Sequence, residues 1–216
     1  MTPDPITAPD PTTGSVISSG VVAVLRAPTA DGFSAVAHVL VSAGITAIEV
    51  TLTSRGALDA IAGLRRQLPE HAVVGAGTVL TADQAKASVD AGAAFLVSPV
   101  LDLELAGGFG VPFYPGCLTP SEIFAAQRSG APLVKLFPAA TVGPRYIKDL
   151  HGPLPDVRIM PTGGIDIGDV AAWLTAGAVA VGLGGPLLGD AASGGSLTAL
   201  ADRARRAADA VVFARS

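Results

Sequence analysis

The chain has 216 residues, of which 50% are hydrophobic and 15% are charged, and its formal net charge is −4. This length and apolar content suit one domain with a sizeable core, and the acidic balance argues against a general nucleic-acid binder. A single cysteine excludes an internal disulfide framework. The lack of any window of about 20 uninterrupted apolar residues argues against a membrane-spanning helix.

The first 19 residues are rich in Pro, Thr, Asp and Ser. They lack the basic start and the apolar run of a secretory signal. We therefore expect residues 1–19 to form a flexible leader, residues 20–216 to form one domain, and the protein to be cytoplasmic.

Eight short apolar runs follow in chain order. They cover residues 21–25, 47–52, 72–75, 95–97, 111–114, 133–137, 157–160 and 179–181. Runs of this length are too short for core helices. Their continuous apolar character is typical of strands buried on both faces of a parallel sheet.

Ala-rich amphipathic segments separate these runs. We expect helices at residues 31–43, 54–68, 81–91, 102–106, 119–128, 144–150, 166–176 and 196–213. Gly92, Gly130 and Gly177 stand at the ends of three of these segments. Glycine at such a position is a common C-terminal cap that leads the chain into the next strand.

Eight strand–helix units in about 200 residues predict an α/β fold, a single (β/α)8 TIM barrel near the lower size limit of that fold. A doubly wound open sheet is the alternative, because strand order is not visible in the sequence. Against it, Leu25-Arg26-Ala27 follows the first strand, where a dinucleotide-binding sheet has a glycine-rich loop.

Lys135 is the strongest candidate for chemistry. It lies inside the apolar run of residues 133–137, whereas Lys86 and Lys148, the other two lysines, lie on amphipathic helices. Burying a cation is costly and favours the neutral amine, which is a nucleophile for a carbonyl carbon. The alternative is a structural lysine whose head pairs with a carboxylate.

Glu49 is the second candidate, a carboxylate within a predicted strand. By alternation Glu49, Thr51 and Thr53 share one face, and the apolar residues between them share the other. Because the outer face of a barrel packs on helices, we expect the polar set to line the lumen. In the lumen, Glu49 is either the ion-pair partner of a lysine or an acid/base group.

Glycines end the seventh and eighth strands, at Gly163-Gly164 and at residues 182–185. In barrels these two loops often bind phosphate through backbone N–H groups. Other residue types are set aside. The three histidines are scattered, so neither a metal cluster nor a His-based triad is predicted, and Cys117 is interpreted as structural.

Six motifs then identify a family resemblance. They are IEVTLT (residues 48–53), VGAGTVLT (74–81), VSP (97–99), PGCLTPSE (115–122), LVKLFPA (133–139) and MPTGGI (160–165). With these motifs in this order, the chain resembles the 2-keto-3-deoxy-6-phosphogluconate (KDPG) and 4-hydroxy-2-oxoglutarate (KHG) aldolases, including the related 6-phosphogalactonate enzymes. The likeness runs from about Val21 to the last helix.

The resemblance implies a class I aldolase, a carbon–carbon lyase without metal or cofactor, assembled as a homotrimer. It would cleave KDPG reversibly to pyruvate and glyceraldehyde 3-phosphate, with the cleavage of KHG to pyruvate and glyoxylate as a second reaction. Lys135 would be the Schiff-base lysine and Glu49 the acid/base. The residues implied to bind the substrate are Arg26, Thr53, Thr78, Pro99, Phe137, Thr162, Gly163, Gly164, Gly184 and Gly185.

Two departures from the family pattern concern substrate binding. Some members carry Arg where this chain has Thr53, so Arg26 and Thr78 would share the contact with the keto-acid carboxylate. Members commonly have Gly-Ser after the eighth strand, where this chain has Gly184-Gly185-Pro186. One hydroxyl donor to a charged acceptor is worth about 1.5–3 kcal/mol.

Several alternatives stay open from the sequence. The substrate is KDPG, its galacto epimer or a non-phosphorylated 2-keto-4-hydroxy acid. More distantly, the chain is a barrel isomerase or synthase acting on a phosphorylated sugar, with Lys135 and Glu49 as a non-covalent pair. A catalytically idle barrel that serves in assembly is a third possibility, disfavoured by the presence of both residues.

Overall fold

The computed structural model describes residues 8–216, and every strand pair within them is parallel. The strands are β1 (Val21–Leu25), β2 (Ala47–Thr51), β3 (Val73–Gly77), β4 (Leu96–Val97), β5 (Phe113–Tyr114), β6 (Gly116–Cys117), β7 (Val134–Leu136), β8 (Ile159–Pro161) and β9 (Val181–Leu183). Each of the eight apolar runs overlaps a strand, and the fifth strand continues into β6. The offset is largest for the eighth run, which shares only Val181 with β9.

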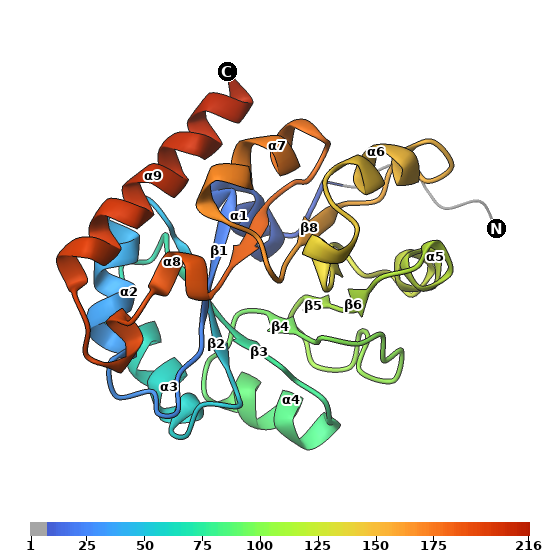
Figure 1. Cartoon of the computed structure of the whole chain (residues 1–216). Helices are drawn as coiled ribbons and strands as arrows, with labels where there is room; N and C mark the ends of the chain where they lie inside the picture. Colours follow the sequence, from blue (N-terminus) through green and yellow to red (C-terminus); the bar gives the residue numbers. More distant parts are fainter. Residues whose placement is uncertain (1–7) are drawn as a thin grey trace.

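The strands close into a ring. One sheet has the order β5-β4-β3-β2-β1-β9 and the other β6-β7-β8. Only Pro115 separates β5 from β6, and its carbonyl accepts a hydrogen bond from the Lys135 N–H of β7 at 2.9 Å, so β5 and β6 act as one strand. A parallel bridge between Thr162 and Gly182 joins the ends of β8 and β9. The predicted eight-stranded barrel is confirmed, and an open sheet is excluded (Figure 1).

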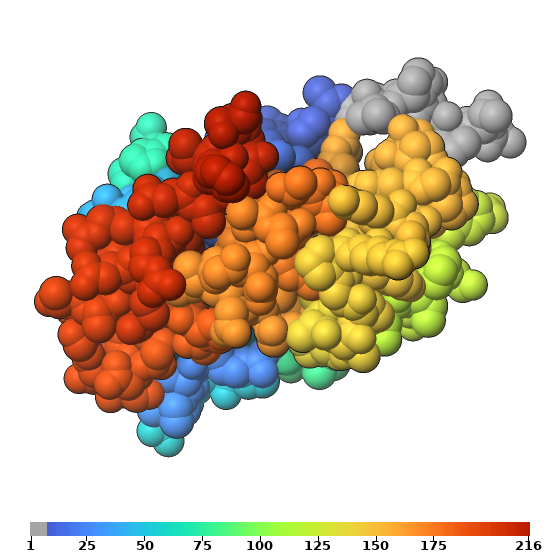
Figure 2. All heavy atoms as spheres, turned by 45° about the horizontal axis from the view of Figure 1, so that its top comes forward, coloured from blue at the N-terminus to red at the C-terminus, as the bar shows by residue number. Residues whose placement is uncertain are grey.

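Helices cover the outside of the barrel. They are α2 (Phe33–Ser42), α3 (Ala57–Gln67), α4 (Ala82–Asp90), α5 (Pro120–Arg128), α6 (Arg145–His151), α7 (Val170–Thr175), α8 (Gly185–Leu188) and α9 (Leu197–Arg215), with 3-10 turns at Ala139–Thr141, Ile167–Asp169 and Ala191–Ser193. Figure 2 shows α9, α7 and α6 side by side on one flank. None of the described helices is long and apolar enough to cross a membrane.

The helix expected at residues 102–106 is absent, and that prediction was wrong. The segment is an irregular loop, in which the Asp102 side chain accepts from the Glu104 N–H at 2.9 Å. Gly107 and Gly110 follow with positive φ. A segment of five residues is too short to offset the cost of helix nucleation.

The expected leader is corrected where the structure describes it. Residues 1–7 lie outside the described part, but Pro11–Ser19 form helix α1, capped by the Asp10 side chain, which accepts from the Thr13 N–H. Val16 is fully buried against lumen residues. At the other end of α1, Arg215 of α9 donates to the Ser18 carbonyl at 2.8 Å. The helix therefore closes the N-terminal end of the barrel.

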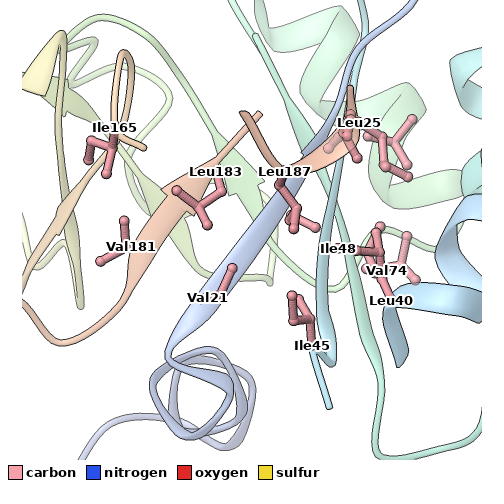
Figure 3. Close-up of a cluster of buried hydrophobic side chains, with 14 of the residues drawn as sticks. Val21, Leu25, Leu40, Ile45, Ile48, Val74, Ile165, Val181, Leu183 and Leu187 are labelled. Carbon is pink, nitrogen blue, oxygen red and sulfur yellow. The ribbon is translucent and has the colours of Figure 1, made fainter. Parts of the chain in front are cut away.

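Two apolar cores follow from strand alternation. The outer core lies between strands and helices, where Ile48 and Val74 lie beside Leu40 of α2 (Figure 3). The inner core fills the half of the lumen at the N-terminal ends of the strands. Its residues are Val16, Val22, Ala47, Phe95, Val97, Tyr114, Leu133, Met160 and Ala180. Because this inner core closes the lumen at the N-terminal ends of the strands, a ligand can reach the polar lumen residues only from the C-terminal ends.

Candidate active site

Lys135 and Glu49 meet inside the barrel. Glu49 projects from β2, the second strand of the ring, and Lys135 from β7, the sixth, so the two residues face each other across the lumen. The Lys135 Nζ lies 3.9 Å from the Glu49 Oε1. The sequence placed each residue on a strand, but only barrel closure brings them together.

Both groups are shielded from water. The side chains of Lys135 and Glu49 are 5% and 1% exposed, whereas Lys86 and Lys148 lie on the surface as predicted. Neither carboxylate oxygen of Glu49 has a hydrogen-bond partner among residues 8–216. A buried carboxylate that lacks hydrogen bonds keeps its lone pairs available for a proton, and it lies beside the amine that can react with a carbonyl.

Of the three polar residues predicted to alternate along β2, Glu49 and Thr51 lie on the strand and Thr53 does not. Thr51 is buried and donates to the Leu25 carbonyl at 3.0 Å. Strand β2 ends at Thr51, so Thr53 lies in the following turn, exposed, with its hydroxyl 3.2 Å from the Thr51 Oγ1. The prediction that Thr53 continues the lumen face was wrong, because the period-2 rule ends where the strand does.

Arg26 and Thr78 lie together at the rim of the barrel. Arg26 follows β1, Thr78 follows β3, and the Arg26 guanidinium donates to the Thr78 hydroxyl at 3.3 Å. Thr78 has φ +60°, a left-handed conformation that is unfavourable for a β-branched residue and that is found mainly at functional sites. The pair offers a cation and a hydroxyl to an anion above the lumen.

Phe137, Pro99 and Thr162 follow three strands of the barrel, and Phe137 contacts the lysine. The Lys135 Nζ lies 5.2 Å from the centroid of the Phe137 ring, a distance typical of a cation–π contact. Thr162 is buried at the end of β8. Pro99 follows β4, and its backbone passes so close to Gly116 that a Cβ there would lie 2.8 Å from the Pro99 Cα.

The glycine loops lie at the ends of two neighbouring strands. Gly163 and Gly164 follow β8 with φ +95° and +73°, values that favour glycine. Gly184 and Gly185 follow β9 at the start of α8. Since the Thr162–Gly182 bridge joins these strand ends, both loops border the same side of the rim.

Cys117 is 2% exposed, and burial, with a smaller contribution from the Glu122 charge, raises its pKa to about 12. It is therefore a neutral thiol near pH 7 and packs as a small hydrophobic side chain, as its sequence context predicted. Gly77, which precedes Thr78 within the motif of residues 74–81 and faces the lumen, was assigned no role from the sequence. Its signal was available in the alternation of glycines with apolar residues along residues 73–77.

Comparisons with known proteins agree with this geometry. A family profile described as "Aldolase: KDPG and KHG aldolase" matches residues 15–196. The 2-dehydro-3-deoxy-6-phosphogalactonate aldolase of Escherichia coli (strain K12) is 37% identical over 172 residues, 77% of this chain and 83% of that protein. The 2-dehydro-3-deoxy-phosphogluconate aldolase of Pseudomonas aeruginosa is 42% identical over 142 residues, 64% of either protein.

A solved structure extends the likeness to the whole fold. The KDPG aldolase from Legionella pneumophila, with pyruvate captured at low pH as a covalent carbinolamine intermediate, superimposes with a TM-score of 0.83 and 28% identity. The alignment covers 91% of this chain and 97% of that one.

Proposed function

Because this chain belongs to the KDPG and KHG aldolase family, we propose that it is a class I aldolase that cleaves KDPG reversibly to pyruvate and glyceraldehyde 3-phosphate. The observation that carries the proposal is the buried amine of Lys135, 3.9 Å from the unpartnered carboxylate of Glu49. KHG, cleaved to pyruvate and glyoxylate, is a second substrate with the same reacting atoms.

Lys135 acts as the nucleophile. Its amine attacks the C2 keto carbon of the substrate, and loss of water from the carbinolamine leaves a protonated Schiff base. Glu49 takes the proton of the C4 hydroxyl, the C3–C4 bond breaks, and its electron pair moves into the iminium to form an enamine. The aldehyde leaves, Glu49 returns its proton to C3, and hydrolysis of the Schiff base releases pyruvate and the free lysine.

The residues around Lys135 and Glu49 bind the substrate. Arg26 and Thr78, which are linked at the rim, suit the keto-acid carboxylate, with Thr53 nearby in the turn after β2. Phe137, Pro99 and Thr162 shape the site around the lysine. We assign the substrate phosphate to the backbone of Gly163, Gly164, Gly184 and Gly185, since glycine allows close approach of an anion to the main-chain N–H groups.

Trapping with borohydride tests the mechanism. Pyruvate with borohydride should add a stable covalent mass to Lys135 in a peptide map of the native protein. Lys135→Met should abolish both the adduct and the cleavage of KDPG, while Lys148→Met, a surface control on α6, should alter neither. A native protein that yields no adduct would favour the isomerase or synthase alternative, in which the lysine stays non-covalent.

The galacto epimer of KDPG is a second candidate substrate. The support is the 37% identity to a 6-phosphogalactonate aldolase, close to the 42% identity to a phosphogluconate aldolase. The ratio of kcat/KM for the two epimers and for KHG decides between them. A non-phosphorylated substrate would give the highest value for KHG.

We further propose that residues 20–216 form the barrel of the catalytic domain, to which helix α1 is added at the N-terminal end. We also propose that the domain assembles as a homotrimer and works in the cytoplasm on a small-molecule substrate, without nucleic acid or membrane. The trimer follows from the family resemblance. Sedimentation of the purified protein and fractionation of the producing cells test the assembly and the location.

A further inference from the structure

Strand β3 presents no side chain to the lumen at two successive inward positions. Its residues Val74 and Ala76 belong to the outer core, so by alternation Gly75 and Gly77 face inward. A barrel of this kind is normally filled by layers of inward side chains from alternate strands. The wall formed by β3 is therefore recessed relative to its neighbours.

Side chains from the two flanking strands occupy this recess. A Cβ built on Gly75 would lie 2.6 Å from Cγ of Phe95, which comes from the β4 side. A Cβ built on Gly77 would lie 2.5 Å from Cδ and 2.6 Å from Cγ of Glu49, which comes from β2. Both positions are closer than real Cβ atoms approach, so neither glycine can gain a methyl group without moving its neighbour.

Packing holds the Glu49 carboxylate in place where hydrogen bonds do not. Neither of its oxygens has a hydrogen-bond partner among the described residues, and its contact with Lys135 is 3.9 Å long. In the ladder Glu49 is paired with Gly75, yet its side chain extends along the strand direction to lie over Gly77. The space above Gly77 therefore determines how far the carboxylate reaches.

We propose that Gly77 is a positioning residue: its missing side chain creates the space in which the Glu49 carboxylate is held against Lys135. This inference rests on the proposed function, in which Glu49 moves the proton. Because the obstructing atoms are the far end of a flexible side chain, a methyl group at Gly77 displaces the carboxylate and leaves the barrel intact.

The test uses the half-reaction with pyruvate, which needs neither the aldehyde nor the phosphate site. Formation of the Schiff base and removal of a C3 proton exchange the methyl protons of pyruvate for deuterium in heavy water. Gly77→Ala should keep the borohydride adduct on Lys135 but lower the exchange rate about 100-fold or more, the loss typical of a misplaced general base.

Gly75→Ala is the matched control, on the same strand and the same face. Its methyl group meets the Phe95 ring, which is buried and has less freedom to move than a carboxylate. We therefore expect Gly75→Ala to lower the melting temperature more than Gly77→Ala, yet to preserve deuterium exchange better. In a Glu49→Gln background, Gly77→Ala should add little further loss, because residues that act as a unit have non-additive effects.

Equal loss of exchange in the two alanine variants, or additive losses in the Glu49→Gln background, would overturn the proposal. A crystal structure of Gly77→Ala gives a readout that does not depend on the reaction. A carboxylate displaced from Lys135 supports the positioning role, and one that remains at its present distance refutes it. If the native protein forms no pyruvate adduct, the proposed function fails, and the crystal structure still decides the role of Gly77.

Discussion

Replacing Gly185 by serine should improve binding of the phosphorylated substrate. Gly185 is the first residue of α8 and is exposed. A Cβ built there meets no atom within 4 Å, and its φ lies outside the left-handed region. The substitution therefore introduces a hydroxyl, common at this place in the family, without strain. Serine is also a better helix residue than glycine by a few tenths of a kcal/mol, so the melting temperature should not fall.

The size of the gain follows from the hydrogen bond that the hydroxyl would donate. A hydrogen bond to a charged group contributes about 1.5–3 kcal/mol. At an exposed position screening favours the lower end of that range. A gain of about 1.4 kcal/mol corresponds to a tenfold increase in kcat/KM for KDPG.

Comparison of two substrates isolates the phosphate contact. Gly185→Ser should raise kcat/KM for KDPG and leave the value for KHG, which has no phosphate, unchanged. Gly168→Ser is the matched control and should change neither value, because Gly168 is exposed in the turn before α7 and a Cβ built on it meets no atom within 4 Å. An equal change for KDPG and KHG, or no change for either, would refute the assignment of the phosphate to this loop.

Three further predictions concern strain, the N-terminal helix and pH. Thr78→Gly removes the β-branched side chain from φ +60°, so thermal unfolding should show a stability that is unchanged or raised by about 1 kcal/mol. The value of kcat/KM should fall, because the hydroxyl is lost. A clear loss of stability would contradict the proposed backbone strain at Thr78. Val16→Ala should destabilise by about 2 kcal/mol, whereas Gly14→Ala, with no atom near its Cβ, should stabilise α1 by about 0.5–1 kcal/mol. If residues 1–19 were a flexible leader, neither substitution would change the stability of the protein. The raised pKa of Cys117, about 12 against an ordinary 9.0, means that the unfolded chain loses its thiol proton first, so stability should be complete below about pH 9 and decline as pH rises toward 12. Cys117→Ala should remove this part of the decline in denaturant titrations at successive pH values.

The sequence predicted the strands well because their signal is local. Each strand of a closed barrel is buried on both faces, which leaves a short continuous apolar run, and each such run overlaps a strand. Lys135 was conspicuous for the same reason, since a charged residue inside such a run has no solvent-facing side. The alternation that placed Glu49 inward also follows from the strand period alone.

The predictions that were wrong concern segments whose structure depends on more than local sequence. The sequence of Pro11–Ser19 is polar and has little periodicity, and the helix there is stabilised by contacts with the lumen floor and with Arg215 at the far end of the chain. The loop at 102–106 has a helical composition but is too short to offset the cost of helix nucleation, although its Leu105 is buried in the core. Thr53 was placed on the lumen face by extending alternation beyond the last residue of β2.

What the sequence determined by itself is therefore the set of strands and the chemical identity of the groups that face inward. The tertiary structure decided which of these groups meet. Lys135 and Glu49 come within 3.9 Å because strands two and six of a ring of eight lie opposite each other, and Glu49 lies where it does because β3 has no side chain at Gly77. Distances across a lumen depend on closure and packing between residues far apart in the chain, and local patterns carry no record of them.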